Sequence, residues 1–487
     1  MNAYCRHTLV VIASLLPVVG FGQFAEDALR FSRLSFGIGA RSVALGGASV
    51  ARAADYSSLF SNPATLTGLR NFEVSIGMSR NMVENTASFL GAPSTGENAA
   101  TRVENAGVVY PIPTTRGSLT LAFGFGRMSD YTSVVDFKGF NGGNSLVQSL
   151  APLTDLYTMS LDDERTFLDS NIPFQVWLAD TSDGYFFPVV TDSVSQSGLV
   201  LEGGGMNHWS FGGGVEVAKN LSVGISLNLV SGRYSYDREF IERDARNVYS
   251  SNYAFPYNFD EFMFVSTIES RLSGFNALLG MSMRKPGRYQ VGLALRTPTT
   301  YEVTETFSDQ GTSRFDDGST YSSGYTSSTS YRVITPSVVS GGLSLTVFDG
   351  LTLMGDAEYT DWTEIQFDTD HPDLLQENRY MKRAFRATTN LRGGAEVTFW
   401  DWGIVLRGGM AYLPSPYKDD PTSFDQKYIT GGVGFELDRN TMLNVSGARG
   451  VWKSFRDNYY IDGLIQPSST QENVTTTKVM VTLAYRF

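Results

Sequence analysis

The sequence predicts an all-β protein, a transmembrane antiparallel β-barrel of about fourteen strands with an N-terminal plug in its lumen. Three observations predict it. Segments of alternating apolar and polar residues recur from residue 72 to the end of the 487-residue chain. Glycine is frequent (49 residues) and charged residues make up only 18%, a poor match to an average cytosolic enzyme. Short polar turns alternate with long loops, as expected for a barrel whose two ends differ.

The first 22 residues predict a secretory signal peptide. Arg6 precedes an apolar run, Leu9 to Phe21, that is too short to span a bilayer and ends in a small-residue cleavage pattern. An N-terminal anchor helix is the alternative, but it needs about 20 apolar residues. With Gln23 as the mature N-terminus, the only cysteine, Cys5, is removed, and disulfides and thiol chemistry are excluded. The net charge of −12 argues against a nucleic-acid partner.

Each predicted strand has one apolar face. In LSVGISLNL, Leu221, Val223 and Ile225 face one way while Ser222 and Gly224 face the other, the period-2 pattern of a strand. The pattern predicts strands near residues 72–82, 102–110, 118–128, 207–217, 221–236, 262–283, 289–303, 331–347, 351–362, 385–400, 402–412, 428–437, 441–452 and 474–487. The long loops, expected to be extracellular, are residues 129–206, 237–261, 304–330, 366–384 and 453–473.

A large soluble β-sandwich or propeller also alternates apolar and polar residues, so it is the alternative fold. Three features favour a membrane barrel over residues 71–487. The second face is unusually small and polar, Trp400 and Trp402 flank a turn, and the chain ends in a strand with Phe487 at its terminus. We therefore expect a multi-pass barrel in the outer membrane of a Gram-negative bacterium, with the lipid bilayer as a partner.

The sequence lacks the motifs of common enzymes. One of its three histidines, His7, lies in the signal peptide, and neither G-x-S-x-G nor H-E-x-x-H occurs. We expect no enzymatic activity, no metal and no cofactor. Catalysis through His208 or His371 is the alternative, because proteases and phospholipases with a barrel fold exist.

Five charged residues alternate with apolar neighbours and are predicted to point into the lumen: Asp356, Glu358, Arg392, Glu396 and Arg407. One interpretation is a polar network that stiffens the interior and tethers the plug. The other is that Arg392 or Arg407 binds the carboxylate of a ligand, since arginine binds carboxylates through two parallel hydrogen bonds. The sequence leaves both open.

Residues 23–70 precede the first strand and are rich in Ala, Gly and Ser, so they lie either in the periplasm or inside the barrel. The lumen of a barrel this wide needs a plug. The stretch GARSVALGGASVARAADYSSLFSNPATLTGL resembles the N-terminal hatch of the FadL family, outer-membrane transporters for long-chain fatty acids and other hydrophobic compounds. The positions that carry this resemblance are Gly46, Gly47, Asp55, Asn62, Pro63 and Ala64.

Two later stretches resemble the same family: VITPSVVSGGLSLTVFDGLTLMGDAEYTDWTEI, and the hairpin that contains Arg407 and Gly408. The resemblance implies passive uptake of a hydrophobic small molecule, such as a fatty acid or an aromatic compound, through a hatch-closed barrel with lateral release into the bilayer. PorV-type proteins of the type IX secretion system share this fold and would instead bind secreted proteins. A structural or adhesin barrel is the third alternative.

The predicted third strand contains LTLAFGFGRM, in which Gly124 and Gly126 leave the inward face bare. Glycine inside a strand weakens pairing and often marks a bend. The family resemblance implies ligand release at a kink in this strand, so these two glycines are the candidate lateral exit. Alternatively, they make room for the hatch.

Overall fold

The computed structural model describes residues 22–35, 37–52, 55–249, 258–461 and 468–487. Apart from Gly22, the predicted signal peptide lies outside the described residues. Of the helices in the described part of the chain, none has the length and hydrophobicity required to cross a membrane.

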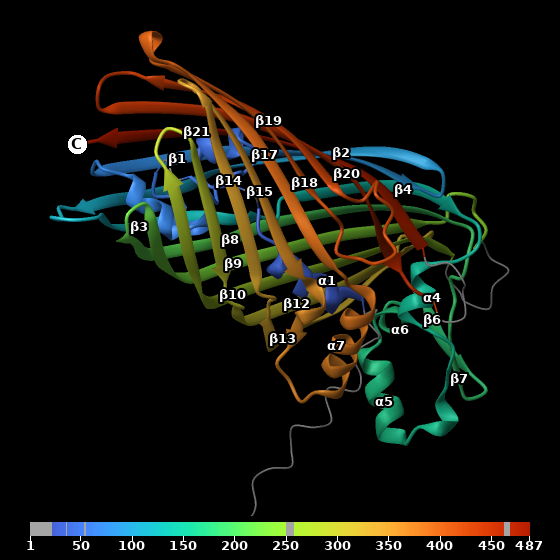
Figure 1. Cartoon of the computed structure of the whole chain (residues 1–487). Helices are drawn as coiled ribbons and strands as arrows, with labels where there is room; N and C mark the ends of the chain where they lie inside the picture. The colour runs from blue at the N-terminus through green and yellow to red at the C-terminus, as the bar shows by residue number, and fades with distance from the viewer. Residues whose placement is uncertain (1–21, 36, 53–54, 250–257, 462–467) are drawn as a thin grey trace, which may run out of the picture.

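The chain forms a closed antiparallel barrel of 14 strands, which confirms the predicted fold (Figure 1). Three of the fourteen are each assigned as two segments. Around the barrel the strands are β1 (Glu73–Phe89), β2 (Ala92–Ile112), β3 (Leu119–Asp130) with β4 (Ser133–Asn141), β8 (Val194–Ala218), β9 (Leu221–Arg243), β10 (Phe259–Lys285), β11 (Tyr289–Arg296) with β12 (Thr300–Phe315), β13 (Thr320–Ile334) with β14 (Val338–Phe348), β15 (Leu351–Asp361), β17 (Ala387–Phe399), β18 (Ile404–Leu413), β19 (Gln426–Glu436), β20 (Thr441–Tyr459) and β21 (Ser468–Arg486). β21 pairs with β1 from Glu73↔Arg486 to Phe89↔Thr470 and closes the ring.

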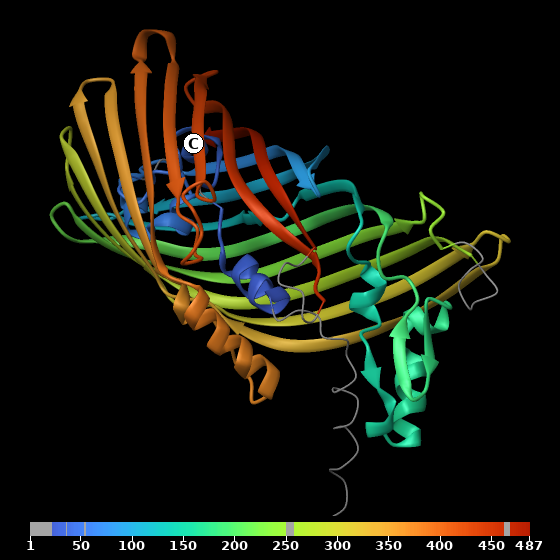
Figure 2. The same ribbon diagram turned by 90° about the vertical axis from the view of Figure 1, so that its right-hand side faces the viewer.

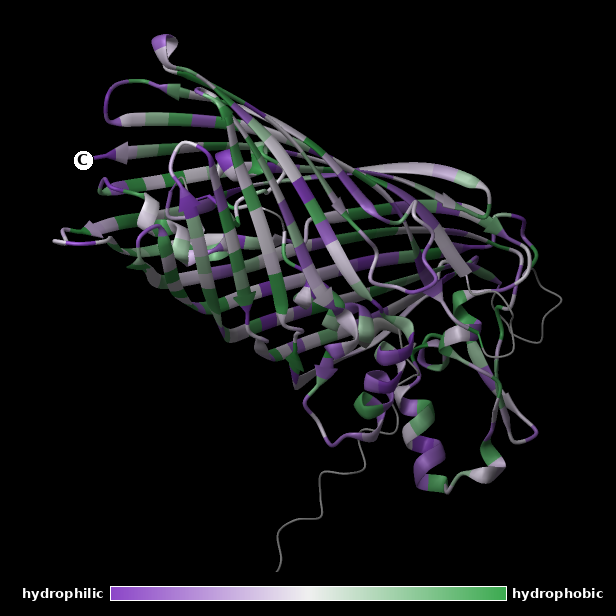
Figure 3. Ribbon diagram, viewed as in Figure 1, coloured by the Kyte–Doolittle hydropathy of each residue, from purple (hydrophilic) through white to green (hydrophobic). Residues whose placement is uncertain are grey.

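The side chains of the strands are arranged with apolar groups outside and polar groups inside. On β9, Ile225 and Leu229 are 48% and 63% exposed, whereas Ser226 and Asn228 are buried. Figure 3 shows hydrophobic and hydrophilic residues alternating along the barrel strands. A soluble sandwich would bury its apolar face, so this distribution fits a barrel surrounded by lipid.

Two barrel strands are interrupted at proline. Pro298 separates β11 from β12, and Pro336 separates β14 from β13. Proline has no backbone N–H and cannot donate to the ladder. A hydrogen bond of 2.9 Å from Thr335 N to Thr299 O joins the two strands at the interruption.

The predicted loops are shorter in the structure than in the sequence analysis. Residues 304–330, expected to be a loop, instead form most of the β12–β13 hairpin. The expected loops 129–206, 237–261 and 453–473 lose residues at their ends to strands. These strand ends lack regular apolar alternation, as expected where strands of a membrane barrel extend beyond the bilayer and need no lipid-facing side chains.

Two loops carry structure of their own. Residues 142–193, here called the loop domain, contain α4 (Leu146–Leu150), α5 (Leu161–Ser170), α6 (Ile172–Gln175) and a three-stranded sheet of β5 (Thr154–Asp155), β7 (Tyr185–Pro188) and β6 (Ala179–Ser182). The loop after β15 carries β16 (Gln366–Phe367) and α7 (Pro372–Ala384). Both project from the barrel end opposite the C-terminus (Figures 1 and 2).

A closed barrel resists detergent until it is heated, because the ladder of strand pairs runs around the whole ring and leaves no end from which it can unravel. We expect unboiled protein to migrate faster than boiled protein on a denaturing gel. Identical migration of the two samples would contradict the closed barrel. This heat shift serves below as the test that a variant has folded.

Candidate functional site

The N-terminal segment lies inside the barrel. Residues 23–70, the hatch, include α1 (Gly22–Ser32), α2 (Ala40–Ala44), α3 (Ser58–Ser61) and the 3-10 helix η1 (Pro63–Gly68). α2 contacts β18, β19, β20 and β21, while η1 contacts β8, β9 and β10 on the other side of the ring. Figure 2 shows these elements surrounded by the strands. That the hatch acts as a plug remains a prediction.

Gly46 and Gly47 form the turn after α2, which lies against the wall. Both have positive φ angles, 68° and 83°, which disfavour any residue with a side chain. A Cβ on Gly46 would overlap the backbone of Met410 on β18. The glycines therefore allow the hatch backbone to contact the wall backbone directly.

Asn62 connects the hatch to itself and to the wall. Its Nδ2 donates to Val50 O at 2.8 Å and to Met281 O at 3.1 Å, and its Oδ1 accepts from Ala64 N at 3.1 Å. Pro63 begins η1, and Ala64 is fully buried against β9 and β10. Asn62 thus binds two backbone groups of the hatch and one backbone carbonyl of the wall.

We expect Asn62→Ala to loosen the hatch by about 3 kcal/mol, since three hydrogen bonds of about 1 kcal/mol each are lost. The barrel should keep its heat shift, and a protease should cut the hatch faster than in the wild type. Asn473→Ala, at an exposed position of β21, is the matched control. Equal cleavage of the two variants would contradict this role of Asn62.

Two of the predicted lumen carboxylates bind the hatch. Asp356 Oδ2 accepts hydrogen bonds from Ser49 N at 2.6 Å and Val50 N at 2.9 Å. Glu396 binds Arg41 of α2, with Nε to Oε2 at 2.8 Å, and also Arg407 of β18 at 2.8 Å. Asp55 accepts a hydrogen bond from Ser57 N at 2.8 Å within the hatch. Among the described residues, it forms no hydrogen bond or ion pair with the wall.

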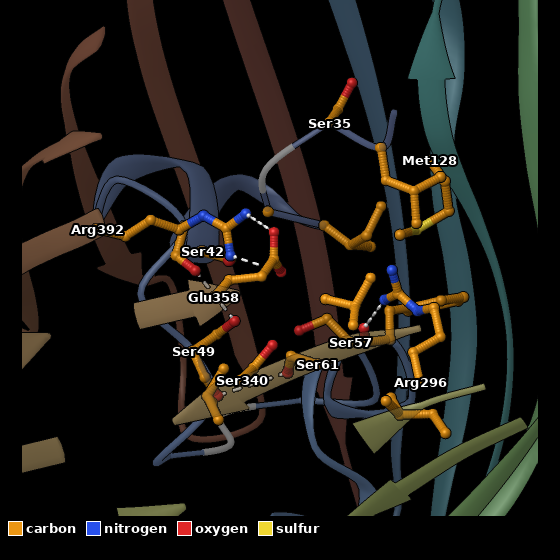
Figure 4. A pocket seen from close by; sticks show the side chains of 18 residues that line it. Ser35, Ser42, Ser49, Ser57, Ser61, Met128, Arg296, Ser340, Glu358 and Arg392 are labelled. Atoms are coloured by element: carbon orange, nitrogen blue, oxygen red, sulfur yellow. Dashed lines mark hydrogen bonds and ion pairs between the residues drawn. The ribbon is translucent and has the colours of Figure 1, made fainter. Parts of the chain in front are cut away.

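The third lumen carboxylate pairs within the wall. Arg392 donates to both oxygens of Glu358, at 2.8 and 3.1 Å, and this pair borders an internal cavity of about 50 Å³ between hatch and wall (Figure 4). Arg296 lies on the opposite side of the cavity and donates to Phe60 O at 3.0 Å. Arg392 and Arg407 both already bind carboxylates of the chain, which favours the tethering network over a ligand counter-ion.

The apolar face of α1 packs against an apolar part of the lumen wall, here called the chamber. Ala28, Leu29 and Phe31 of α1 are buried against this chamber. Its wall residues include Tyr131, Met206, Val230, Tyr234, Leu272, Tyr301, Val303, Tyr331, Trp362 and Phe385. The ring of Phe31 lies 6.2 Å from Tyr131 and 6.1 Å from Tyr234, in edge-to-face geometry. The side chains of α1 thus occupy the space beside this part of the wall.

The wall is broken between β2 and the third barrel strand. β2 pairs with β3 only from Ile112↔Leu119 to Asn105↔Gly126, although β2 continues to Ala92. Beyond Gly126 the third strand turns inward, and β4 lies across the lumen face of β1 and β2. Asn85 of β1 donates to Val134 O at 3.0 Å, and Asn98 of β2 donates to Ser133 O at 3.1 Å. Residues 92–104 of β2 thus have no β3 or β4 ladder partner in the described structure.

The structure places the two candidate exit glycines at this break. A Cβ on Gly124 would overlap the ring of Tyr56, and a Cβ on Gly126 would lie 2.9 Å from Phe60. Both glycines therefore make room for the hatch, the alternative interpretation of the sequence. Pairing nevertheless ends at Gly126, so the exit role of this strand region remains a proposal.

Charged residues and an apolar groove flank the break. Asp130 at the end of β3 lies 3.6 Å from Arg102 of β2 and 3.7 Å from Arg127. On the outer surface beside this cluster is a groove of about 620 Å³. Its lining includes Val74, Ile76, Val103, Phe123, Phe125 and Trp209. Lipid-facing apolar residues therefore continue to the edge of the break.

The two remaining histidines lie in different surroundings. His208 is buried in β8 opposite Gly126, and His371 is half exposed just before α7. Among the described residues, no group of three or more His, Cys, Asp or Glu side chains is arranged to hold a metal ion.

Several site residues were missed by the sequence analysis. Arg41 and Tyr56 lie in the segment quoted for the family resemblance, but their partners Glu396 and Phe125 lie far away in the sequence. Tyr56 and Phe60 are the two aromatic residues of this segment, four positions apart. That spacing was a signal that they fill space beside bare glycines.

Solved structures share this fold. The Pseudomonas putida toluene transporter TodX matches with a TM-score of 0.52 and 14% identity over 93% of this chain and 99% of that chain. A FadL homologue of Pseudomonas aeruginosa matches with a TM-score of 0.55 and 12% identity over the same shares. The monoaromatic hydrocarbon channel CymD matches with a TM-score of 0.50 and 14% identity, also over 93% and 99%.

At identities this low the similarity is one of fold, and it confirms the predicted resemblance to the fold of the FadL family. The named structures are transporters and channels rather than enzymes. No family model matches the sequence, and no curated protein sequence matches it significantly.

Proposed function

We propose that this protein takes up hydrophobic compounds passively across the outer membrane and releases them sideways into the bilayer. The observation that carries the proposal is the break between β2 and the third barrel strand. A ligand that leaves the lumen there enters lipid without crossing the polar interior of the hatch. The fold shared with TodX, a toluene transporter, and with CymD, a hydrocarbon channel, supports this function.

The proposed path connects three features already described. It begins in the apolar chamber, whose Tyr131 directly follows Asp130 of the charged cluster. It passes the cluster at the end of β3 and reaches the outer groove at Val103 and Phe125. Apolar surface thus borders both ends of the break, and burying it against a hydrophobic ligand is favourable at each.

The chamber favours an uncharged ligand. Most of its wall side chains are aliphatic or aromatic, and the buried carboxylate of Glu305 beside them already accepts hydrogen bonds from Ser270 and Tyr331. The guanidinium groups of Arg392 and Arg407 are already paired with carboxylates. We therefore propose neutral lipophiles, such as small aromatic hydrocarbons, ahead of long-chain carboxylates.

The test compares labelled toluene, oleate and glucose in bacterial cells that lack their own transporters for hydrophobic compounds. Cells that produce the full chain should take up toluene faster than cells without it, and glucose at the same rate. Faster oleate uptake than toluene uptake would move the proposed ligand class to fatty acids. No acceleration of either hydrophobic compound would contradict the function.

We expect uptake to depend on pH through Asp27 of α1. Burial raises the pKa of this carboxyl from 3.8 to about 7, against the opposing effect of Arg30. When α1 is packed in the chamber, Asp27 keeps a proton that it would release if α1 were free in water. The packing of α1 is therefore strongest below pH 3.8 and weakens as pH rises through about 7. Because a ligand must displace α1 from the chamber, uptake should be faster at high pH than at low pH.

The control for this prediction is a matched pair of variants. Asp27→Asn should reduce the pH dependence, since burial also raises the pKa of Glu26 on the same helix, whereas Asp162→Asn on exposed α5 should leave it unchanged. A pH profile that is the same in both variants would contradict the role of Asp27.

A further inference from the structure

Among the residues that the structure describes, the outer part of β13 is a sheet edge without a strand partner. From Thr320 to Tyr331 this strand pairs with β12 on one side only, and within the described residues its second side gains a partner, β16, only at Val333 and Ile334. Figure 2 shows this edge bordering the open side of the barrel end, beside the loop domain.

The direction of the free backbone groups follows from the ladder. Phe315 N donates to Ser319 O at 3.0 Å at one end of the hairpin, and Thr335 N donates to Thr299 O at 2.9 Å at the other. The odd-numbered residues of β13 are therefore the ones bonded to β12. The even-numbered residues from Thr320 to Ser330 direct their N–H and C=O groups toward the free edge.

This edge lacks the features that usually protect one. Edge strands commonly carry lysine, proline or a bulge that prevents pairing with other chains. Residues Thr320 to Ser330 contain no charged residue and no proline, and their register with β12 is continuous. Their side chains are mainly hydroxyl groups and tyrosine, which suit a strand.

The loop domain beside the edge is strongly acidic. Residues 142–193 contain eight carboxylates and one arginine, a net charge of −7 in a chain whose net charge is −12. This domain is fixed to the hairpin by the ring of Trp177, 6.0 Å from that of Tyr321, and by Ser313 Oγ, which donates to Val176 O at 2.6 Å. A strand paired along the edge would thus pass beside an acidic surface.

We infer that the β13 edge binds an extended, positively charged segment of a soluble polypeptide by adding it to the sheet as a further strand. The edge supplies the main-chain hydrogen bonds and the loop domain supplies the charge complementarity.

A second copy of this chain does not fit this edge. Two copies in one membrane have the same orientation and are related by a rotation about the membrane normal. This rotation leaves their β13 strands running in the same direction across the membrane, so the two edges do not pair antiparallel. The inference goes beyond the proposed function and does not depend on it.

The experiment measures the fluorescence anisotropy of labelled peptides of about twelve residues, the length of the edge, with the full chain in detergent micelles. One peptide alternates Lys and Thr. A second alternates Lys and Pro, with the same charge but no ability to form a strand. A third alternates Glu and Thr. The Lys-Thr peptide should bind saturably, and the other two at least about tenfold more weakly.

Variants of the chain distinguish the contribution of the β13 backbone from that of the acidic loop domain. Thr326→Pro with Ser328→Pro removes two outward N–H donors and leaves the β12 ladder intact, so affinity should fall about tenfold or more. Thr326→Ala with Ser328→Ala keeps the donors and should bind as the wild type does. Changing Asp162, Asp169 and Asp183 to Asn should weaken binding and reduce its salt dependence.

Three results would overturn the inference: no saturable binding of the Lys-Thr peptide, equal binding of the Lys-Pro peptide, or equal affinity of the proline and alanine variants. The heat shift on a gel identifies any variant that has not folded. If the proline variant does not fold, the comparison of the three peptides on the wild-type chain tests the inference by itself.

Discussion

Deletion of residues Gln23 to Thr67 is expected to convert a closed barrel into an open channel. The deletion removes α1 from the apolar chamber and the rest of the hatch from the space between opposite walls. A barrel of fourteen strands is narrower than the porins, which have about 16 to 18 strands. Its lumen is still wide enough that ions would pass through it if no segment of the chain filled it. Single-channel conductance in a planar bilayer should therefore rise strongly.

The barrel itself should survive this deletion. Its closure rests on strand pairs such as β1 with β21, which include no hatch residue. Arg407 keeps Glu396 and Asn444 as partners within the wall, and Asp356 becomes accessible to water. The deletion variant should thus keep its heat shift.

The matched control is a chain from which Leu161 to Ser170, α5 of the loop domain, are deleted outside the barrel. This variant should keep the wild-type conductance. A folded hatch deletion that conducts no better than the α5 deletion would show that the hatch does not close the lumen.

The barrel was predictable because its signal is local. Alternation such as Leu221 to Leu229 identifies a strand without knowledge of its neighbours, and the fourteen predicted strands all occur. The β12–β13 hairpin was missed since its outer residues face water on one side and the loop domain on the other. Its Ser/Thr-rich pattern therefore resembles that of a loop.

The inward direction of the lumen charges was also predictable, but their partners were not. Asp356 lies directly opposite Arg392 in the ladder, yet Arg392 binds Glu358 and Asp356 binds the hatch backbone. Which carboxylate each arginine binds depends on the directions of the side chains. It also depends on Arg41, which binds Glu396 although the two residues are far apart in the sequence.

The wall break was only partly predictable. The sequence pointed to Gly124 and Gly126, and pairing with β2 does end at Gly126. The glycines themselves are explained by the rings of Tyr56 and Phe60. The inward turn occurs farther on, between β3 and β4, and is stabilised by Asn85 and Asn98 of the neighbouring strands. No pattern within the third strand reveals such contacts.

Lateral release is tested most directly by fastening the two sides of the break. Arg102 of β2 and Asp130 of β3 lie 3.6 Å apart across it. Arg102→Cys with Asp130→Cys introduces two thiols into a chain whose only other cysteine, Cys5, lies in the predicted signal peptide. A short bifunctional thiol reagent can then link the strands. The control pair is Glu302→Cys with Arg332→Cys, which are also 3.6 Å apart but lie opposite each other in the intact β12–β13 ladder.

The measurement is uptake of labelled toluene before and after cross-linking, with the extent of linkage determined by mass spectrometry. The account predicts that linking residues 102 and 130 lowers uptake to that of cells without the protein, whereas linking 302 and 332 leaves it unchanged. Undiminished uptake through a barrel fully linked between residues 102 and 130 would contradict lateral release at this break.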